Sequence, residues 1–136
     1  MASIREEFPV AAPPDVVWSA LRDFDAVDER LARGFVVASD AADDARVVTF
    51  ANGAVAREVL VAVDDDARRL VYSVVESPLG TTHHNASAQV LPDGEGGSRF
   101  VWITDVLPHE VAPPIREMMA LGAAAIRQTL ERPYAA

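Results

Sequence analysis

The sequence predicts one α+β domain in which an antiparallel sheet curls around a long C-terminal helix. Two observations carry this prediction. Short segments that alternate apolar and polar residues, separated by turn residues, fill the middle of the chain, and a helical period follows them. With 136 residues, of which 50% are hydrophobic and 24% charged, the chain has the length and composition of a single globular domain over residues 1–136.

The first part of the chain predicts a strand followed by two short helices. Ile4, Phe8 and Val10 share one parity over residues 3–10, which is typical of a half-buried strand. Pro13-Pro14-Asp15 then favours the start of a helix, because proline is tolerated in a first helical turn and an early acidic residue suits the helix dipole. A second short helical stretch is expected over residues 27–33.

The middle of the chain predicts six further strands. Asn52-Gly53 and Asp93-Gly94 are typical of hairpin turns in which both central residues have positive φ. Strands joined by such short turns have to be antiparallel. The expected strands cover residues 35–40, 46–51, 54–63, 69–77, 83–92 and 98–107.

The last part of the chain predicts a long amphipathic helix over residues 113–132. Apolar residues recur there at spacings of three and four, and charged residues occupy the other side. The small residues 122–125 would let this helix approach the sheet closely or leave open volume beside it.

Charge and composition exclude several functions. The net charge of −9, without a basic stripe, argues against nucleic acid as a partner. The chain has no Cys, which excludes thiolate catalysis, and no Lys, which excludes a Schiff base. No apolar run reaches the about 18 residues of a membrane span and no signal-peptide pattern opens the chain, so we expect no membrane span and a cytoplasmic protein. No residue pattern calls for a cofactor.

Three motifs resemble one known family. They are Val10-Ala-Ala-Pro-Pro-Asp-Val-Val-Trp18 with Leu21-Arg-Asp-Phe24, then Arg68-Arg-Leu-Val-Tyr72, and Ser98-Arg-Phe-Val-Trp102. Together with the order of elements, they resemble the polyketide cyclase/dehydrase group of the START-like superfamily. The resemblance implies a helix-grip fold, a curved seven-stranded antiparallel sheet around the long helix. It also implies a cavity for a small hydrophobic ligand, used either for aldol-type ring closure and dehydration or for carrying lipids, hormones or quinones.

Strand parity indicates which side chains face such a cavity. The more apolar face of each strand is taken as inward, and residues 54–63 stay ambiguous because the parity of Glu58 competes with that of Arg57. The long helix would add Gly122 and, as the second reading after ordinary helix core, Met118 and Met119. The strand residues expected at the cavity are Tyr72, Glu76, His84, Trp102, Thr104 and, on one of the two parities, Glu58.

His84 and Glu76 are the candidate catalytic pair. A histidine beside a carboxylate in an apolar site can remove a proton α to a carbonyl, with Tyr72 or Thr104 hydrogen-bonding the enolate oxygen. The alternatives are a ligand-orienting His84, an exposed Glu76 at a strand end, and Tyr72 and Trp102 as core packing. No metal site is expected, because adjacent strand residues such as His83 and His84 point to opposite faces.

Three functions stay open on the sequence alone. The first is a ligand-binding pocket of the cyclase type, the second a non-catalytic carrier of a hydrophobic or aromatic ligand, and the third a protein-interaction module. The first two require a cavity, whereas the third requires a filled interior and a large exposed apolar patch. A monomer and a homodimer are both compatible with the sequence.

Overall fold

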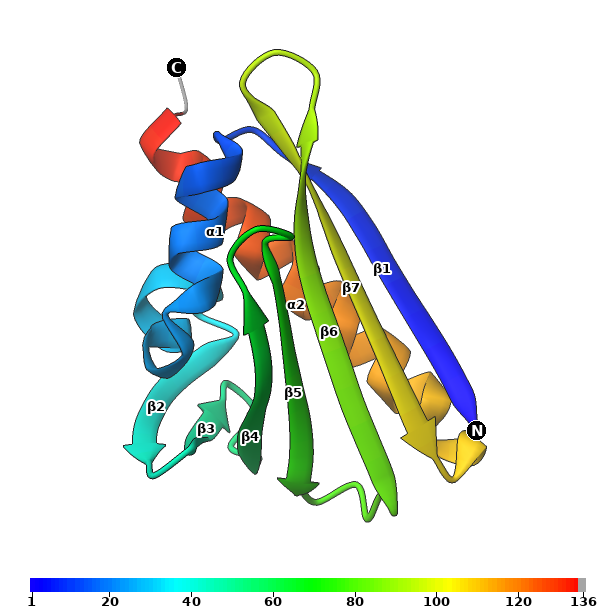
Figure 1. Cartoon of the computed structure of the whole chain (residues 1–136). Helices are drawn as coiled ribbons and strands as arrows, with labels where there is room; N and C mark the ends of the chain where they lie inside the picture. Colours follow the sequence, from blue (N-terminus) through cyan, green and yellow to red (C-terminus); the bar gives the residue numbers. More distant parts are fainter. Residues whose placement is uncertain (135–136) are drawn as a thin grey trace.

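The computed structural model describes residues 1–134 and contains one seven-stranded antiparallel sheet. The strands lie in the order β1-β7-β6-β5-β4-β3-β2, so the first strand pairs with the last (Figure 1). Residues 135–136 of the predicted domain lie outside the described residues. The strands are β1 Ala2–Val10, β2 Val36–Ala42, β3 Ala45–Phe50, β4 Val55–Asp64, β5 Arg69–Glu76, β6 His83–Asp93 and β7 Gly97–Leu107.

The first of the two predicted short helices is α-helical and the second is not. Helix α1, Pro14–Arg22, begins at Pro14 as the proline pair predicts. A 3₁₀ turn, η1, Phe24–Ala26, and a π-helix, η2, Val27–Leu31, follow it. The wider turn of η2 closes with the Ala32 N–H donating to the Val27 carbonyl at 2.8 Å.

The first hairpin loop is one residue longer than the predicted strand bounds imply, and the second is two residues shorter. Phe50 N–H donates to the Ala54 carbonyl at 2.9 Å, which leaves residues 51–53 as a three-residue loop in which Gly53, at φ +89°, takes the left-handed position. Asp93 pairs in register with Gly97, so residues 94–96 form the second loop. The prediction that both residues of each Asx-Gly pair have positive φ was therefore wrong, and the glycine alone has it.

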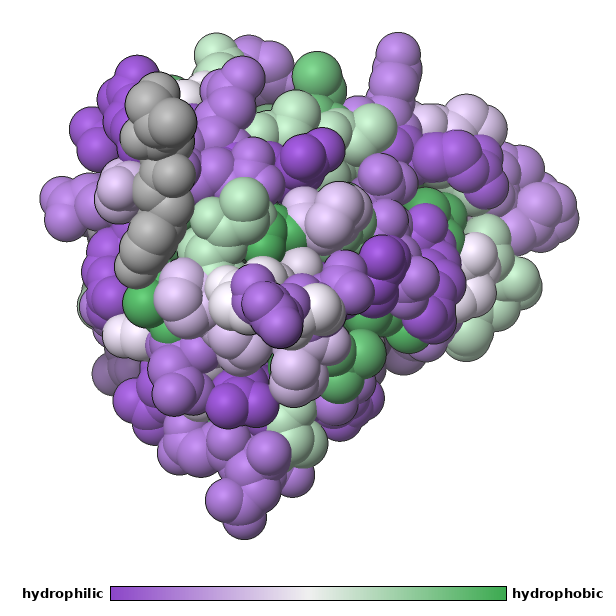
Figure 2. Space-filling view, turned by 90° about the horizontal axis from the view of Figure 1, so that it is seen from above, coloured by the Kyte–Doolittle hydropathy of each residue, from purple (hydrophilic) through white to green (hydrophobic). Residues whose placement is uncertain are grey.

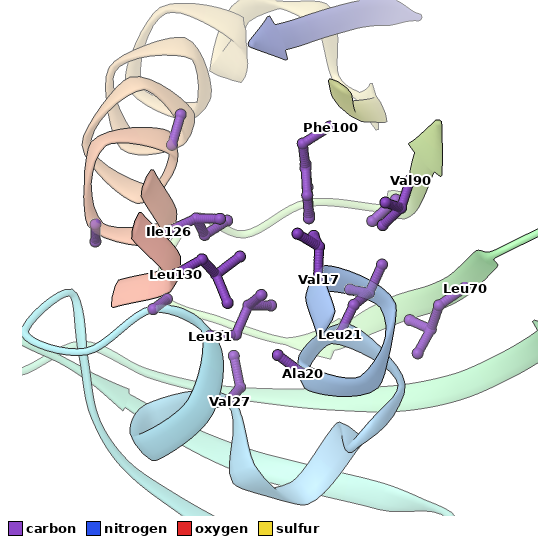
Figure 3. Packing of buried hydrophobic residues seen from close by; sticks show 14 of the residues in the cluster. Val17, Ala20, Leu21, Val27, Leu31, Leu70, Val90, Phe100, Ile126 and Leu130 are labelled. Atoms are coloured by element: carbon purple, nitrogen blue, oxygen red, sulfur yellow. The ribbon is translucent and has the colours of Figure 1, made fainter. Parts of the chain in front are cut away.

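The long helix α2, Ala112–Glu131, runs across one face of the sheet (Figure 1). Its bounds lie one residue before the predicted ones at each end. Side chains from α1, η2, α2 and the inner face of the sheet point toward one another in the core, as Leu21, Leu31, Phe100 and Ile126 show (Figure 3). At the end of the molecule that carries α1, the short helices and the sheet therefore both pack against α2.

The surface at that end is mostly hydrophilic, with small hydrophobic groups between the polar side chains (Figure 2). Within residues 1–134, no helix is long and apolar enough to cross a membrane.

Candidate ligand-binding cavity

A cavity lies between α2 and the inner face of the sheet. The space open to the centre of a water-sized molecule is about 70 Å³. That space holds several waters, at about 10–15 Å³ each, but it is small beside the about 300–1,000 Å³ of a drug-sized ligand site. The wall is largely apolar and includes Leu21, Leu31, Phe35, Val48, Phe50, Leu70, Val74, Phe100, Ile115 and Ile126.

Most of the predicted site residues meet at this cavity. Strand register explains why, since Tyr72 lies opposite Ala86, which in turn lies opposite Thr104. In β4 the buried parity is that of Glu58, whereas Arg57 is half-buried on the other face. The predicted residues in the wall are Glu58, Tyr72, His84, Trp102, Thr104, Met118, Met119 and Gly122.

Glu76 does not reach the cavity. A bulge shifts the β4–β5 register, so that Arg57 lies opposite Glu76 while Glu58 lies opposite Val74. Glu76 is exposed and borders a shallow outer depression together with Arg57 and Pro78. The prediction that Glu76 pairs with His84 inside the cavity was therefore wrong, because parity counted along one strand misses a bulge.

Arg46 is a cavity residue that sequence reasoning missed. Its Nε and Nη2 each lie 2.8 Å from Glu58 Oε1, and both side chains are 8% exposed. Its Nη1 donates to the Phe24 carbonyl at 2.8 Å. The signal was present: Arg46 shares parity with Val48, and the hairpin around Asn52-Gly53 brings it opposite Glu58.

Aromatic rings cover the Arg46 guanidinium. Its central carbon lies 3.9 Å from the centroid of the Phe24 ring and 5.2 Å from that of the Tyr72 ring. Guanidinium groups pack favourably on aromatic faces, and more so away from water. Ion pair and rings therefore form one buried polar end of an otherwise apolar cavity.

The Tyr72 hydroxyl remains protonated. Burial raises the pKa of Tyr72, and the nearby negative charge of Glu58 raises it further. The hydroxyl accepts a hydrogen bond from Trp102 Nε1 at 3.2 Å. No acceptor is found for its own hydrogen among residues 1–134, so that hydrogen is free for a ligand.

His84 is a neutral imidazole at pH 7. Burial lowers its pKa to about 4, with a further contribution from the adjacent His83. The side chain is 7% exposed, and Nδ1 has no hydrogen-bond partner in the described part of the chain. A group with this pKa is a weak base at neutral pH, but it offers one donor and one acceptor to a ligand.

Gly122 makes room for Trp102. A Cβ at this position would lie 3.0 and 3.1 Å from two carbons of the Trp102 indole and 3.3 Å from a carbon of the Phe35 ring. Glycine in a helix interior is less favourable than alanine by about 1 kcal/mol. Gly122 therefore lets α2 pass over the indole that forms one wall of the cavity.

Replacing Gly122 by Leu should displace the Trp102 indole into the cavity. We expect a loss of about 1–3 kcal/mol in the free energy of unfolding, as for other overpacked cores, and loss of ligand binding. Urea unfolding and a ligand titration measure the two effects. Leu at the neighbouring exposed position, Ala124→Leu, is the matched control, and equal behaviour of the two variants would contradict this role of Gly122.

Comparison with known proteins finds one matching family and several similar solved structures. The family model described as polyketide cyclase / dehydrase and lipid transport matches residues 1–132. Among solved structures, XoxI from Bacillus cereus is similar over 100% of both chains, at 19% identity and a TM-score of 0.88. A Thermobifida fusca protein matches at 28% identity and a TM-score of 0.77, with 97% of this chain and 95% of that chain covered. A search of curated proteins found no match.

One enzyme and one START superfamily protein are also similar to this chain in structure. Norcoclaurine synthase from Thalictrum flavum, solved with a transition-state analogue, matches at 21% identity and a TM-score of 0.70, covering 98% of this chain and 96% of that chain. A START superfamily protein from Mycobacterium smegmatis matches at 14% identity and a TM-score of 0.74, over 96% and 98% of the two chains.

The curved sheet and the long helix across it form a helix-grip fold with a cavity between them, and the START superfamily protein shares that fold. The chain belongs to the polyketide cyclase / dehydrase and lipid transport family.

Proposed function

We propose that the cavity binds a small, mostly apolar molecule with a polar group that hydrogen-bonds to His84 or Tyr72. One observation carries the proposal: the buried Nδ1 of His84 has no partner among residues 1–134, and His84 is one of the residues that line the apolar cavity. A buried polar atom without a partner costs about 1–3 kcal/mol. A ligand oxygen or nitrogen would satisfy it, and water would do so when no ligand is bound.

The polar groups favour binding and orientation over proton abstraction. His84 is a weak base at neutral pH because its pKa is lowered. The Glu58 carboxylate is engaged in the ion pair with Arg46. Tyr72 keeps its hydrogen and can donate it to a carbonyl or hydroxyl oxygen. A carrier or a ligand sensor is the function that this chemistry supports best.

A cyclase or dehydrase is the second candidate, and the family description names it beside lipid transport. In that case His84 would accept the proton α to a ligand carbonyl, and the Tyr72 hydroxyl would stabilise the enolate oxygen by donating a hydrogen bond. Such a ligand would have to raise the pKa of His84 in the complex. The protein-interaction module receives less support, because the interior contains a cavity.

Native mass spectrometry of the protein as purified tests the proposal directly. A retained small molecule supports binding, and its mass restricts the chemical class. If neither a retained molecule nor saturable binding of neutral aromatic compounds is found, the proposal fails. The same spectra give the oligomeric state.

Replacing His84 by Ala separates the two candidate functions. For a carrier, loss of one hydrogen bond should weaken binding about 2–10-fold, with no turnover to lose. For a cyclase, turnover should fall about 10²–10⁴-fold while affinity changes only severalfold. Affinity and product formation are measured together on a poly-ketone or aromatic ligand. The outward-facing neighbour supplies the control, His83→Ala, and equal effects of the two variants would exclude His84 from the site.

A further inference from the structure

The charged side chains of the cavity wall cancel each other. Arg46 and Glu58 are the charged residues among the described residues that line it, and they form one ion pair. The remaining polar groups of the wall, on Tyr72, His84, Trp102 and Thr104, are neutral at pH 7. The wall therefore presents hydrogen-bonding groups but no net charge.

Partners within the protein also engage part of the Arg46 guanidinium. Each of its three guanidinium nitrogens has an acceptor at 2.8 Å, either Glu58 Oε1 or the Phe24 carbonyl. The rings of Phe24 and Tyr72 lie over the guanidinium carbon. A ligand carboxylate that displaced Glu58 from Arg46 would leave the Glu58 carboxylate buried without a partner.

We infer that the cavity selects ligands without net charge, such as phenols, ketones or amides, and rejects carboxylates and phosphates of the same skeleton. This inference rests on the proposed binding function and narrows it to a substrate class. Transfer of an unpaired charge into an apolar site is far less favourable than transfer of a neutral group that finds a hydrogen bond. Fatty acids in their ionised form are thereby excluded as the ligand.

Benzamide and benzoate form the matched pair for the test. They share the ring and nearly the same shape, and differ by one full charge at pH 7, since carboxyl groups titrate near pH 4. In an NMR titration, the two tryptophan indole N–H groups give separate signals that report on two different sites. Trp102 Nε1 bonds to Tyr72 at the cavity, whereas Trp18 Nε1 bonds to Asp65 and serves as an internal reference.

We expect benzamide to shift the Trp102 signal saturably and benzoate to bind at least about tenfold more weakly. Benzoate binding as tightly as benzamide overturns the inference and leaves the proposed function standing. Binding of neither compound overturns the proposed function, and the inference with it.

A charge variant tests whether the Arg46–Glu58 pair sets the preference. Glu58→Gln leaves the Arg46 charge uncompensated, so the ratio of benzoate to benzamide affinity should rise at least about tenfold. Glu76→Gln makes the same chemical change outside the cavity and should leave that ratio as in the wild type. An unchanged ratio in a folded Glu58→Gln variant overturns the assignment to this pair. If that variant does not fold, the wild-type comparison decides the inference.

Discussion

Replacing Arg46 by Met should lower the free energy of unfolding by about 3–5 kcal/mol, because it leaves the Glu58 carboxylate buried without its counter-ion. Both side chains are almost entirely shielded from water, and Arg46 also satisfies the Phe24 carbonyl. Urea unfolding at pH 7 measures the change. The size of the effect comes from the stranded charge rather than from the attraction within the pair.

Removing both charges should undo most of this loss. The double variant Arg46→Met/Glu58→Met should be near the wild type in stability, or above it, since apolar replacements of buried ion pairs are often neutral or stabilising. Arg30→Met breaks an exposed pair with Asp23 and should have little effect. A double variant as unstable as Arg46→Met would contradict this. It would show that the lost stability comes from the packing of the Arg46 side chain against the Phe24 ring rather than from the unpaired charge.

Acidification should destabilise the protein through His84 by about 3 kcal/mol between pH 7 and pH 4. The pKa of His84 is about 4 in the folded protein against 6.5 in the unfolded chain. In this window the unfolded state binds more protons, so the free energy of unfolding falls as the pH falls. The stabilisation is fully present above pH 6.5, and it is lost progressively until the pH reaches about 4.

The His84 contribution is measured as a difference between proteins, because many carboxylates also titrate as the pH falls. Unfolding curves of wild type and His84→Gln are recorded from pH 7 to pH 4. Over this range the free energy of unfolding of the wild type should fall by about 3 kcal/mol more than that of His84→Gln. His83→Gln should retain most of the wild-type dependence, since burial is the larger cause of the shift. Parallel curves for wild type and His84→Gln would contradict the burial of a neutral imidazole.

The fold was predictable from the sequence because its determinants are local. Alternation with a period of two places Tyr72, His84 and Thr104 on one face of their strands wherever pairing is regular. The spacing of three and four over residues 113–132 likewise identifies α2 and the side that carries Met119 and Gly122. These patterns determine which side chains face inward, whatever those side chains contact.

The polar end of the cavity was decided by tertiary structure. A bulge in β5 at Val75, opposite Arg57 and Glu58 of β4, sends Glu76 outward, and no residue type in β5 marks that bulge. The pairing of Arg46 with Glu58 depends on the length of a loop, and its cover by Phe24 depends on where η1 docks. The close approach of the Trp102 indole to Gly122 depends on how α2 docks on the sheet. Local periodicity determines the face on which a side chain lies, whereas register, docking and packing determine its partner, its pKa and the space that remains for a ligand.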